Sequence, residues 1–211
     1  MKIGILGAEC SGKSTLAHAL VTLLTATYPD ITVIDEYLRT WCAEHGRPPQ
    51  AHEQAHVAHT QAQRIRQAAS ACVIADTTPL VTAVYSDVLF NDPTLYPEAI
   101  AFQRTLDVTL LMGLDIAWVA DGIQRDGMAM QQRIDTRLRE TLLAHQLPFA
   151  SVYGQGAERT EAALTAITHT NTKHRAQQGT GQPWVWVCDT CSDAACEHRL
   201  FRRFTQGSMG L

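Results

Sequence analysis

The chain has 211 residues, of which 45% are hydrophobic and 18% charged, and its formal net charge is −4. This length allows one α/β domain with a sizeable core and a small appendage. The acidic balance and the lack of a basic stripe argue against nucleic acid as a partner, and no run approaches the ~20 apolar residues of a membrane span.

Short apolar runs alternate with helical patterns along most of the chain. The apolar runs predict buried strands at residues 2–6, 31–35, 71–77, 107–113 and 149–154. The segments between and after them predict helices at 14–26, 36–45, 50–69, 79–90, 97–104, 128–145 and 156–171. Such alternation predicts a three-layer α/β/α domain whose five-stranded, mostly parallel sheet is covered on both faces. We therefore expect a main domain at 1–172, a linker at 173–183 and a Cys- and His-rich tail at 184–211.

The stretch GAECSGKS, from Gly7 to Ser14, stands between the first strand and the first helix. It fits the P-loop pattern G-x-x-x-x-G-K-[ST], in which glycines let backbone N–H groups converge on phosphates at a helix N-terminus. The alternative is an ordinary glycine turn, but the strand-loop-helix context favours a nucleotide site and a P-loop NTPase fold. Lys13 is expected to reach the β- and γ-phosphates, and the Ser14 hydroxyl to hold Mg²⁺. The residues expected to bind Mg-ATP, or GTP in its place, are Gly7, Glu9, Cys10, Ser11, Gly12, Lys13, Ser14 and Thr15.

Asp76 closes the third apolar run, in VIADTT. A carboxylate at this point is the Walker-B arrangement, which holds Mg²⁺ directly or through water. The alternative is an N-cap for the helix that starts near Pro79. Thr78 directly precedes Pro79 and is the better cap, which leaves Asp76 for the metal.

Glu36 and Arg39 follow the second strand in EYLR. Ligands of open α/β sheets bind at the carboxyl ends of the strands, where a carboxylate can accept the proton of a substrate hydroxyl. We expect Glu36, Arg39 and the adjacent Tyr37 to face the substrate. The alternative is a surface ion pair between residues i and i+3.

A glycine-bounded stretch, WVADGIQRDG, is a candidate lid that holds Trp118, Asp121 and Arg125. An arginine brought over the phosphates stabilises the charge on the transferring group. Arg133 follows on the next predicted helix and joins the candidate lid or substrate residues. A polar surface loop is the alternative for this segment.

These motifs together resemble the ribosylnicotinamide kinase domain of bacterial NadR-type proteins, within a wider group of P-loop ATPase and kinase domains. The resemblance spans roughly residues 1–170 and rests on GAECSGKSTL, DEYLRTW, IADTTPLVTAVY and DVTLLMGLDIAWVADGIQRDG. It implies transfer of the ATP γ-phosphate to the 5′-hydroxyl of nicotinamide riboside. It also implies that Glu36, Arg39 and Asp76 face the substrate and metal and that Asp121 and Arg125 belong to the lid. The chain departs from the family pattern D-G-x-R, because Gln124 takes the place of the arginine, and it lacks the adenylyltransferase domain of full-length NadR proteins.

The cysteines divide into two groups. Since Met1-Lys2 leads directly into an apolar run with no signal-peptide pattern, we expect a cytoplasmic protein without disulfides. Cys10, Cys42 and Cys72 are expected to be small buried residues. Cys188, Cys191, Cys196 and His198 supply the ligands of a structural zinc site; the alternative is a reduced tail with incidental cysteines.

The features together predict an ATP-dependent small-molecule kinase that phosphorylates a nucleoside, with nicotinamide riboside as the leading candidate. Two alternatives remain open at this point. One is a nucleotide-dependent regulatory ATPase that acts through a protein partner at the cysteine tail. The other is a kinase for a deoxynucleoside or another small alcohol.

Overall fold

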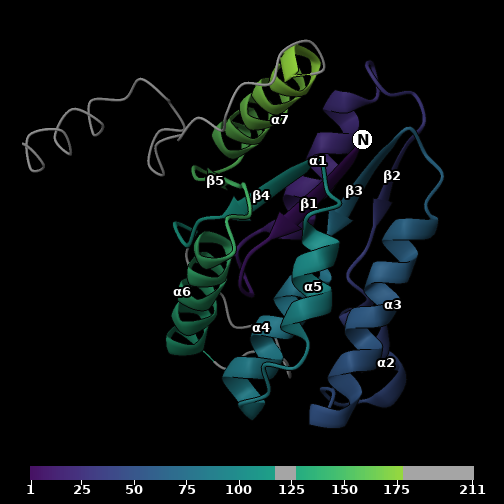
Figure 1. The fold of residues 1–211 in the computed structure, drawn as a ribbon. Coiled ribbons are helices and arrows are strands. Elements are labelled where there is room, and N and C mark those ends of the chain that lie inside the picture. The colour runs from purple at the N-terminus through teal and green to yellow at the C-terminus, as the bar shows by residue number, and fades with distance from the viewer. Residues whose placement is uncertain (117–126, 178–211) are drawn as a thin grey trace, which may run out of the picture.

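Five parallel strands form the centre of the molecule. The computed structural model describes residues 1–116 and 127–177. Its strands are β1 (Lys2–Leu6), β2 (Ile31–Ile34), β3 (Cys72–Asp76), β4 (Val108–Met112) and β5 (Ala150–Val152). They lie in the order β2-β3-β1-β4-β5, and every neighbouring pair is parallel (Figure 1). The predicted α/β fold with its five-stranded sheet is thereby confirmed.

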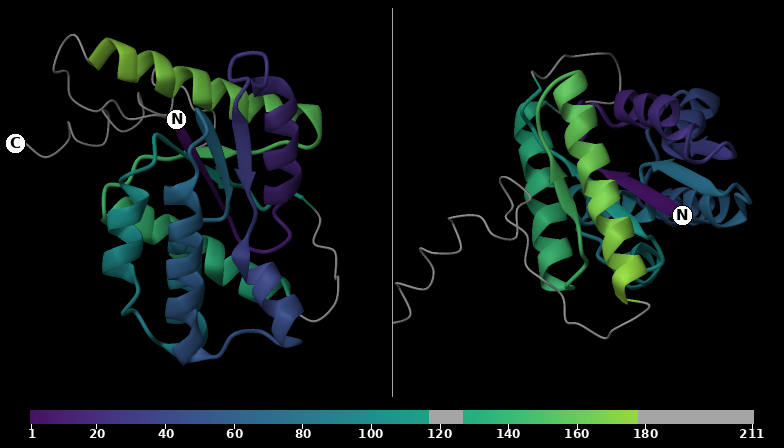
Figure 2. Two further views of the ribbon diagram at one scale, coloured as in Figure 1. Left: turned by 90° about the vertical axis from the view of Figure 1, so that its right-hand side faces the viewer. Right: turned by 90° about the horizontal axis from the view of Figure 1, so that it is seen from above.

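Helices cover both faces of this sheet (Figure 2). One face carries α1 (Lys13–Leu24) and α7 (Ala157–Gln177), and the other carries α3 (Gln54–Gln67), α4 (Pro79–Phe90), α5 (Tyr96–Gln103) and α6 (Met128–Ala144). The helix α2 (Tyr37–His45) and a 3₁₀ turn (Ala51–Glu53) lead into α3 and pack beside it. Helix α7 continues through residues 173–177, which the sequence assigned to the linker.

The core is split by the sheet into two layers because side chains alternate along β1. Ile3 and Ile5 are fully buried against α1 and α7, whereas Leu6 is buried against α4 and α6. The strands β1, β3 and β4 are buried on both faces, which is why they read as unbroken apolar runs. The edge strand β2 is only half-buried.

The carboxyl ends of the strands gather the candidate site. From β1 the chain passes to β2 and β3 on one side of the sheet, and later to β4 and β5 on the other. This reversal makes a topological switch point at the end of β1, which is where α/β sheets bind ligands. The loop after β1 is Gly7–Gly12, so the P-loop occupies this point.

Two further expectations have an outcome in the fold. Across residues 1–116 and 127–177, no helix combines the length and apolar character needed to cross a bilayer. Cys42 and Cys72 are buried as expected, but Cys10, in the P-loop, is only half-buried.

Candidate nucleotide and acceptor site

The P-loop joins β1 to α1 through a tight turn. Gly12 has the left-handed backbone (φ 80°, ψ 22°) that starts α1, a conformation that glycine adopts without steric cost. At Gly7, a Cβ atom would lie 2.6 Å from the Ser11 hydroxyl, so a side chain there would open the loop. The first turn of α1 carries no acidic residue. The loop and the positive end of the helix dipole therefore lie together, an arrangement that favours anions.

Lys13 and Ser11 both bind the inside of this loop. The Lys13 ammonium donates to the Ala8 carbonyl over 2.8 Å, and the Ser11 hydroxyl donates to the same carbonyl over 2.7 Å. Lys13 is 7% exposed, so its charge is held beside the loop and not in solvent. Thr15, one turn into α1, is exposed. Lys13 and Ser11, both predicted to bind phosphate, thus share one backbone carbonyl of the loop, that of Ala8.

Glu9 faces the other way, toward α4. Its backbone N–H donates to the Tyr85 hydroxyl over 3.3 Å, and the same hydroxyl donates to the Glu9 carboxylate over 3.0 Å. Burial, together with the negative charge of Glu9, raises the pKa of Tyr85 well above its ordinary value. Tyr85 therefore stays a neutral donor that anchors the P-loop to α4.

Asp76 ends β3 under the P-loop and is 2% exposed. Burial raises the pKa of Asp76, and this effect outweighs a hydrogen bond from Ser14 and the nearby charge of Lys13, which both lower it. One Asp76 carboxylate oxygen is buried without a hydrogen-bond partner. A buried oxygen without a partner, next to a hydroxyl, suits Mg²⁺, which prefers oxygen ligands. The residues present therefore fit the expected metal.

Glu36 and Arg39 lie close to this carboxylate. They form the i, i+3 ion pair, with 3.0 Å between Arg39 Nε and Glu36 Oε2, and the Glu36 side chain is 14% exposed against 60% for Arg39. The charge of Glu36 contributes to the raised pKa values of both Asp76 and Tyr85. Glu36 is therefore close enough to both Asp76 and Tyr85 for its charge to act on each of them.

Tyr37 packs on α3. Its backbone N–H donates to the Gln61 side chain over 2.8 Å, and its hydroxyl lies 3.4 Å from His56 Nε2. Gln61 is 2% exposed and also donates to the Thr77 carbonyl over 3.0 Å. This glutamine, which sequence reasoning missed, links the start of α2 to the loop after Asp76. Nothing in the local pattern distinguishes it from other polar residues of α3.

Thr78 occupies the N-cap position of α4, as expected, with an extended backbone. Its side chain makes no cap hydrogen bond, and its hydroxyl donates to Gln103 over 2.8 Å. Gln103 also donates to Thr109 on β4 over 2.8 Å. The N-cap position was predicted correctly, but the cap hydrogen bond is absent because the Thr78 hydroxyl binds Gln103 on α5 instead.

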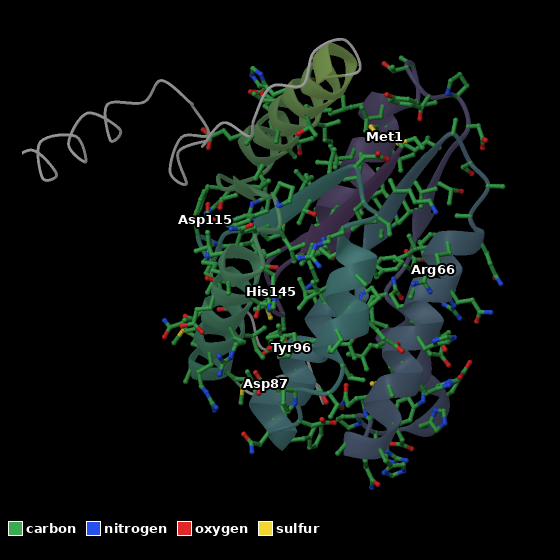
Figure 3. All side chains as sticks on the ribbon, viewed as in Figure 1. Met1, Arg66, Asp87, Tyr96, Asp115 and His145 are labelled. Carbon is green, nitrogen blue, oxygen red and sulfur yellow. The ribbon has the colours of Figure 1, made fainter. Side chains whose placement is uncertain are left out.

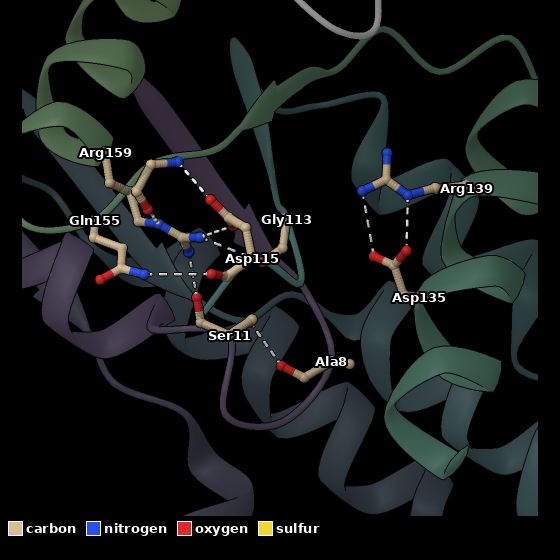
Figure 4. Close-up of polar contacts among 9 residues, drawn as sticks. Ala8, Ser11, Gly113, Asp115, Asp135, Arg139, Gln155 and Arg159 are labelled. Atoms are coloured by element: carbon tan, nitrogen blue, oxygen red, sulfur yellow. Dashed lines mark hydrogen bonds and ion pairs between the residues drawn. The ribbon is translucent and has the colours of Figure 1, made fainter. Parts of the chain in front are cut away.

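A buried arginine on α7 is the largest feature that the sequence did not reveal. Arg159 is 4% exposed and donates to the backbone carbonyl of Ser11 over 2.6 Å and to that of Gly154 over 2.7 Å (Figure 4). It also pairs with Asp115, which follows β4. The residues that make these contacts lie in three different loops, so no spacing in the sequence signals them.

Arg133 lies on the exposed side of α6, in an open groove of about 520 Å³ between α6 and the end of α4. Asp87 lines the same groove and pairs with Arg137 over 3.2 Å, while Tyr96 donates to Asp87 over 2.9 Å (Figure 3). Outside the described residues lie the candidate lid residues Trp118, Asp121 and Arg125 and the expected zinc ligands Cys188, Cys191, Cys196 and His198.

Comparisons with known proteins agree with this architecture. A family model described as an AAA domain matches residues 2–159, whereas no curated protein matches the chain by sequence. A NadR protein in complex with NR superposes with a TM-score of 0.67 at 18% identity, and a second NadR structure, with NAD and AMP-PNP, does so with 0.60 at 17%. These alignments cover 81% and 88% of this chain but 51% of each NadR chain, so the chain spans about half of that protein.

Two further solved structures share the fold over their whole length. Thymidylate kinase from Ehrlichia chaffeensis has a TM-score of 0.59 at 13% identity, and 80% of this chain aligns with 97% of that one. Deoxyadenosine kinase from M. mycoides, with the products dCMP and dCDP, has a TM-score of 0.55 at 18% identity, with 82% and 100% covered. The expected P-loop fold is therefore confirmed, and the NadR structures share it.

Proposed function

The chain belongs to the AAA domain family, and from this premise we propose that it is an ATP-dependent kinase for the hydroxyl group of a nucleoside. The observation that carries the proposal is the buried Asp76 oxygen without a partner, beside Ser14 and the P-loop. A P-loop alone binds nucleotide, but a buried carboxylate at the neighbouring strand end adds the second half of a magnesium site. The shared fold with NadR and two nucleoside or nucleotide kinases supports the same class of reaction.

The roles follow from the positions around this site. Ser14 and Asp76 would hold Mg²⁺, which when bound neutralises charge on the β- and γ-phosphates. Lys13 is charged and close to the loop, so it stabilises the charge that develops during transfer. Glu36 accepts the proton of the acceptor hydroxyl, and Arg39 fixes the orientation of that carboxylate through their ion pair.

The lid and the acceptor pocket complete the proposal. In this proposal Arg125 supplies a positive charge over the phosphates, and Trp118 and Asp121 close the pocket. Arg133 serves as a second cation at the groove between α4 and α6. Nicotinamide riboside is the proposed acceptor, because the motif combination resembles the NadR-type kinase domain and a NadR protein bound to NR shares the fold.

One assay tests donor, acceptor and site together. ADP release is measured with Mg-ATP, with and without nicotinamide riboside, in wild type and Lys13→Ala. We expect the riboside to stimulate ADP release, with nicotinamide mononucleotide as product, and the variant to lose the stimulation. Deoxyadenosine and thymidine serve as competing acceptors. Stimulation by one of these alone would replace the proposed acceptor, and ADP release that no nucleoside changes would instead support a regulatory ATPase.

The cysteine tail is proposed to hold a structural zinc ion. Cys188, Cys191, Cys196 and His198 supply three thiolates and one imidazole, which is a closed tetrahedral set. The test is the zinc content of purified wild type and Cys191→Ser. One equivalent of zinc lost in the variant supports the site, and a metal-free wild type contradicts it.

A further inference from the structure

Two P-loop carbonyl groups, which are two residues apart in the sequence, accept hydrogen bonds from side chains in the second half of the chain. The Glu9 carbonyl accepts a hydrogen bond from the Gln131 side chain on α6 over 2.7 Å. The Ser11 carbonyl accepts one from the Arg159 guanidinium on α7 over 2.6 Å (Figure 4). Gln131 and Arg159 are 5% and 4% exposed, so both donor side chains are buried.

The geometry of the peptide unit gives these bonds a consequence. In a trans peptide the carbonyl and the following N–H point in opposite directions, and none of the described peptide bonds is cis. A fixed Glu9 carbonyl therefore fixes the N–H of Cys10, and a fixed Ser11 carbonyl fixes that of Gly12. These N–H groups are directed away from the two clamping side chains. In a P-loop, consecutive backbone N–H groups of this kind are the donors that hold phosphate.

Both of the oriented residues have left-handed backbones. Cys10 has φ 56° and Gly12 has φ 80°. A residue other than glycine pays a steric cost in this region and keeps the conformation only when its surroundings hold it there. The carbonyls on either side of Cys10 are separately held, because Gln131 binds the one before it and Arg159 binds the one after it. The two hydrogen bonds thus hold the backbone on both sides of the left-handed residue Cys10.

Arg159 contributes more than one bond. Its guanidinium also donates to Gly154 over 2.7 Å and to Gly113 over 3.4 Å, and it pairs with Asp115. Burial lowers the pKa of Arg159, and the Asp115 carboxylate opposes that effect. The planar guanidinium fork can serve these several acceptors at fixed angles, which an ammonium group cannot. The same side chain therefore ties the P-loop to the loops that follow β4 and β5.

We propose that Arg159, assisted by Gln131, is a positioning residue for the triphosphate. By holding the outer carbonyls, the two side chains orient the Gly12 and Cys10 N–H groups toward the phosphates before ATP arrives. The inference rests on the proposed use of the P-loop for ATP, but not on the identity of the acceptor. It differs from a purely structural role, because the loss of affinity should then affect ligands that carry phosphates and not adenosine.

The test is direct binding of Mg-ATP, Mg-ADP and adenosine to Arg159→Lys, by titration calorimetry. The variant keeps the positive charge and loses the fork. We expect affinity for ATP and ADP to fall about ten- to a hundredfold, and affinity for adenosine to change by less than about twofold. Gln131→Met should show the same pattern with a smaller loss, and it serves if Arg159→Lys does not fold.

Arg139 provides the matched control. It makes a comparable ion pair with Asp135, with 2.8 Å between Arg139 Nε and the carboxylate (Figure 4). It also donates a hydrogen bond to Ser151 over 3.3 Å. Arg139→Lys removes the same kind of fork from α6 and should leave all three affinities unchanged. Folded Arg159→Lys that binds ATP as tightly as wild type overturns the proposal, as does an equal loss for ATP and adenosine. If wild type binds Mg-ATP but phosphorylates no nucleoside, the proposed kinase function fails while this test still stands.

Discussion

Replacing Asp76 by asparagine should make the protein more stable and less active. The carboxylate is 2% exposed, and burial raises its pKa although Lys13 and Ser14 lower it. The free-energy cost of burying the charge is therefore larger than the stabilisation that these two neighbours provide. Removing an incompletely compensated buried charge should raise the free energy of unfolding by about 1–2 kcal/mol. For a domain of this size, that corresponds to a rise in Tm of about 2–8 °C. Turnover should fall at least about a hundredfold, because the metal loses a ligand.

Thermal unfolding without ligand, and again with saturating Mg-ATP, measures both effects. Wild type should gain about 2.7 kcal/mol when the ligand is at a hundred times its Kd, and Asp76→Asn should lose most of this gain. A raised pKa means that the folded state binds more protons than the unfolded state between the two pKa values. Wild-type stability without ligand should therefore fall as the pH rises through the raised pKa of Asp76, and the variant should lack this step. A destabilised variant, or one with an undiminished gain from Mg-ATP, would refute the reasoning.

Three further substitutions test the packing and the charges around the site. Gly4→Ala should cost about 1–3 kcal/mol in urea unfolding, because its Cβ would lie 2.6 Å from Leu106 Cδ1; an unchanged midpoint would contradict the close packing at β1. Arg47 holds the pKa of Glu53 at about 2 through a hydrogen bond, so stability should be lost as the pH falls from about 4.5 toward 2, and Glu53→Gln should remove that loss from acid titrations followed by circular dichroism. Thr77→Val should stabilise by about 1 kcal/mol, because the Thr77 hydroxyl is buried without a hydrogen-bond partner; a lower Tm would show that the hydroxyl is satisfied.

The sheet was predictable because its strands are buried on both faces. Unbroken apolar runs bounded by polar residues, Gly or Pro mark β1, β3 and β4 to within one residue. The last helix runs to Gln177 and not to residue 171, because no glycine or proline interrupts the sequence before Gly179. The prediction works for these elements because each forms from residues that are close in sequence and buries an apolar face.

The candidate site was predictable only where a motif fixes it. The P-loop and Asp76 were found because phosphate and metal chemistry demands particular residue types at fixed spacing. Tyr85 and Arg159 were missed because each meets the P-loop from 76 or 148 residues away, and long-range pairing leaves no period in the sequence. The missing cap hydrogen bond of Thr78 was not predictable for the same reason, since Gln103, which binds its hydroxyl, lies 25 residues away.

The central position of β1 also determines when, during synthesis, the sheet and the contacts of the P-loop can be completed. The strand pairs with β3 and β4 and not with β2, the next strand along the chain, and the P-loop that follows it is bound by a residue of α7. A nascent chain therefore exposes its P-loop long before the partners of that loop have left the ribosome. Late, non-local contacts of this kind slow folding and leave apolar strands open to aggregation meanwhile. On the proposed role of Arg159, a nascent chain should therefore bind nucleotide tightly only after α7 has been translated.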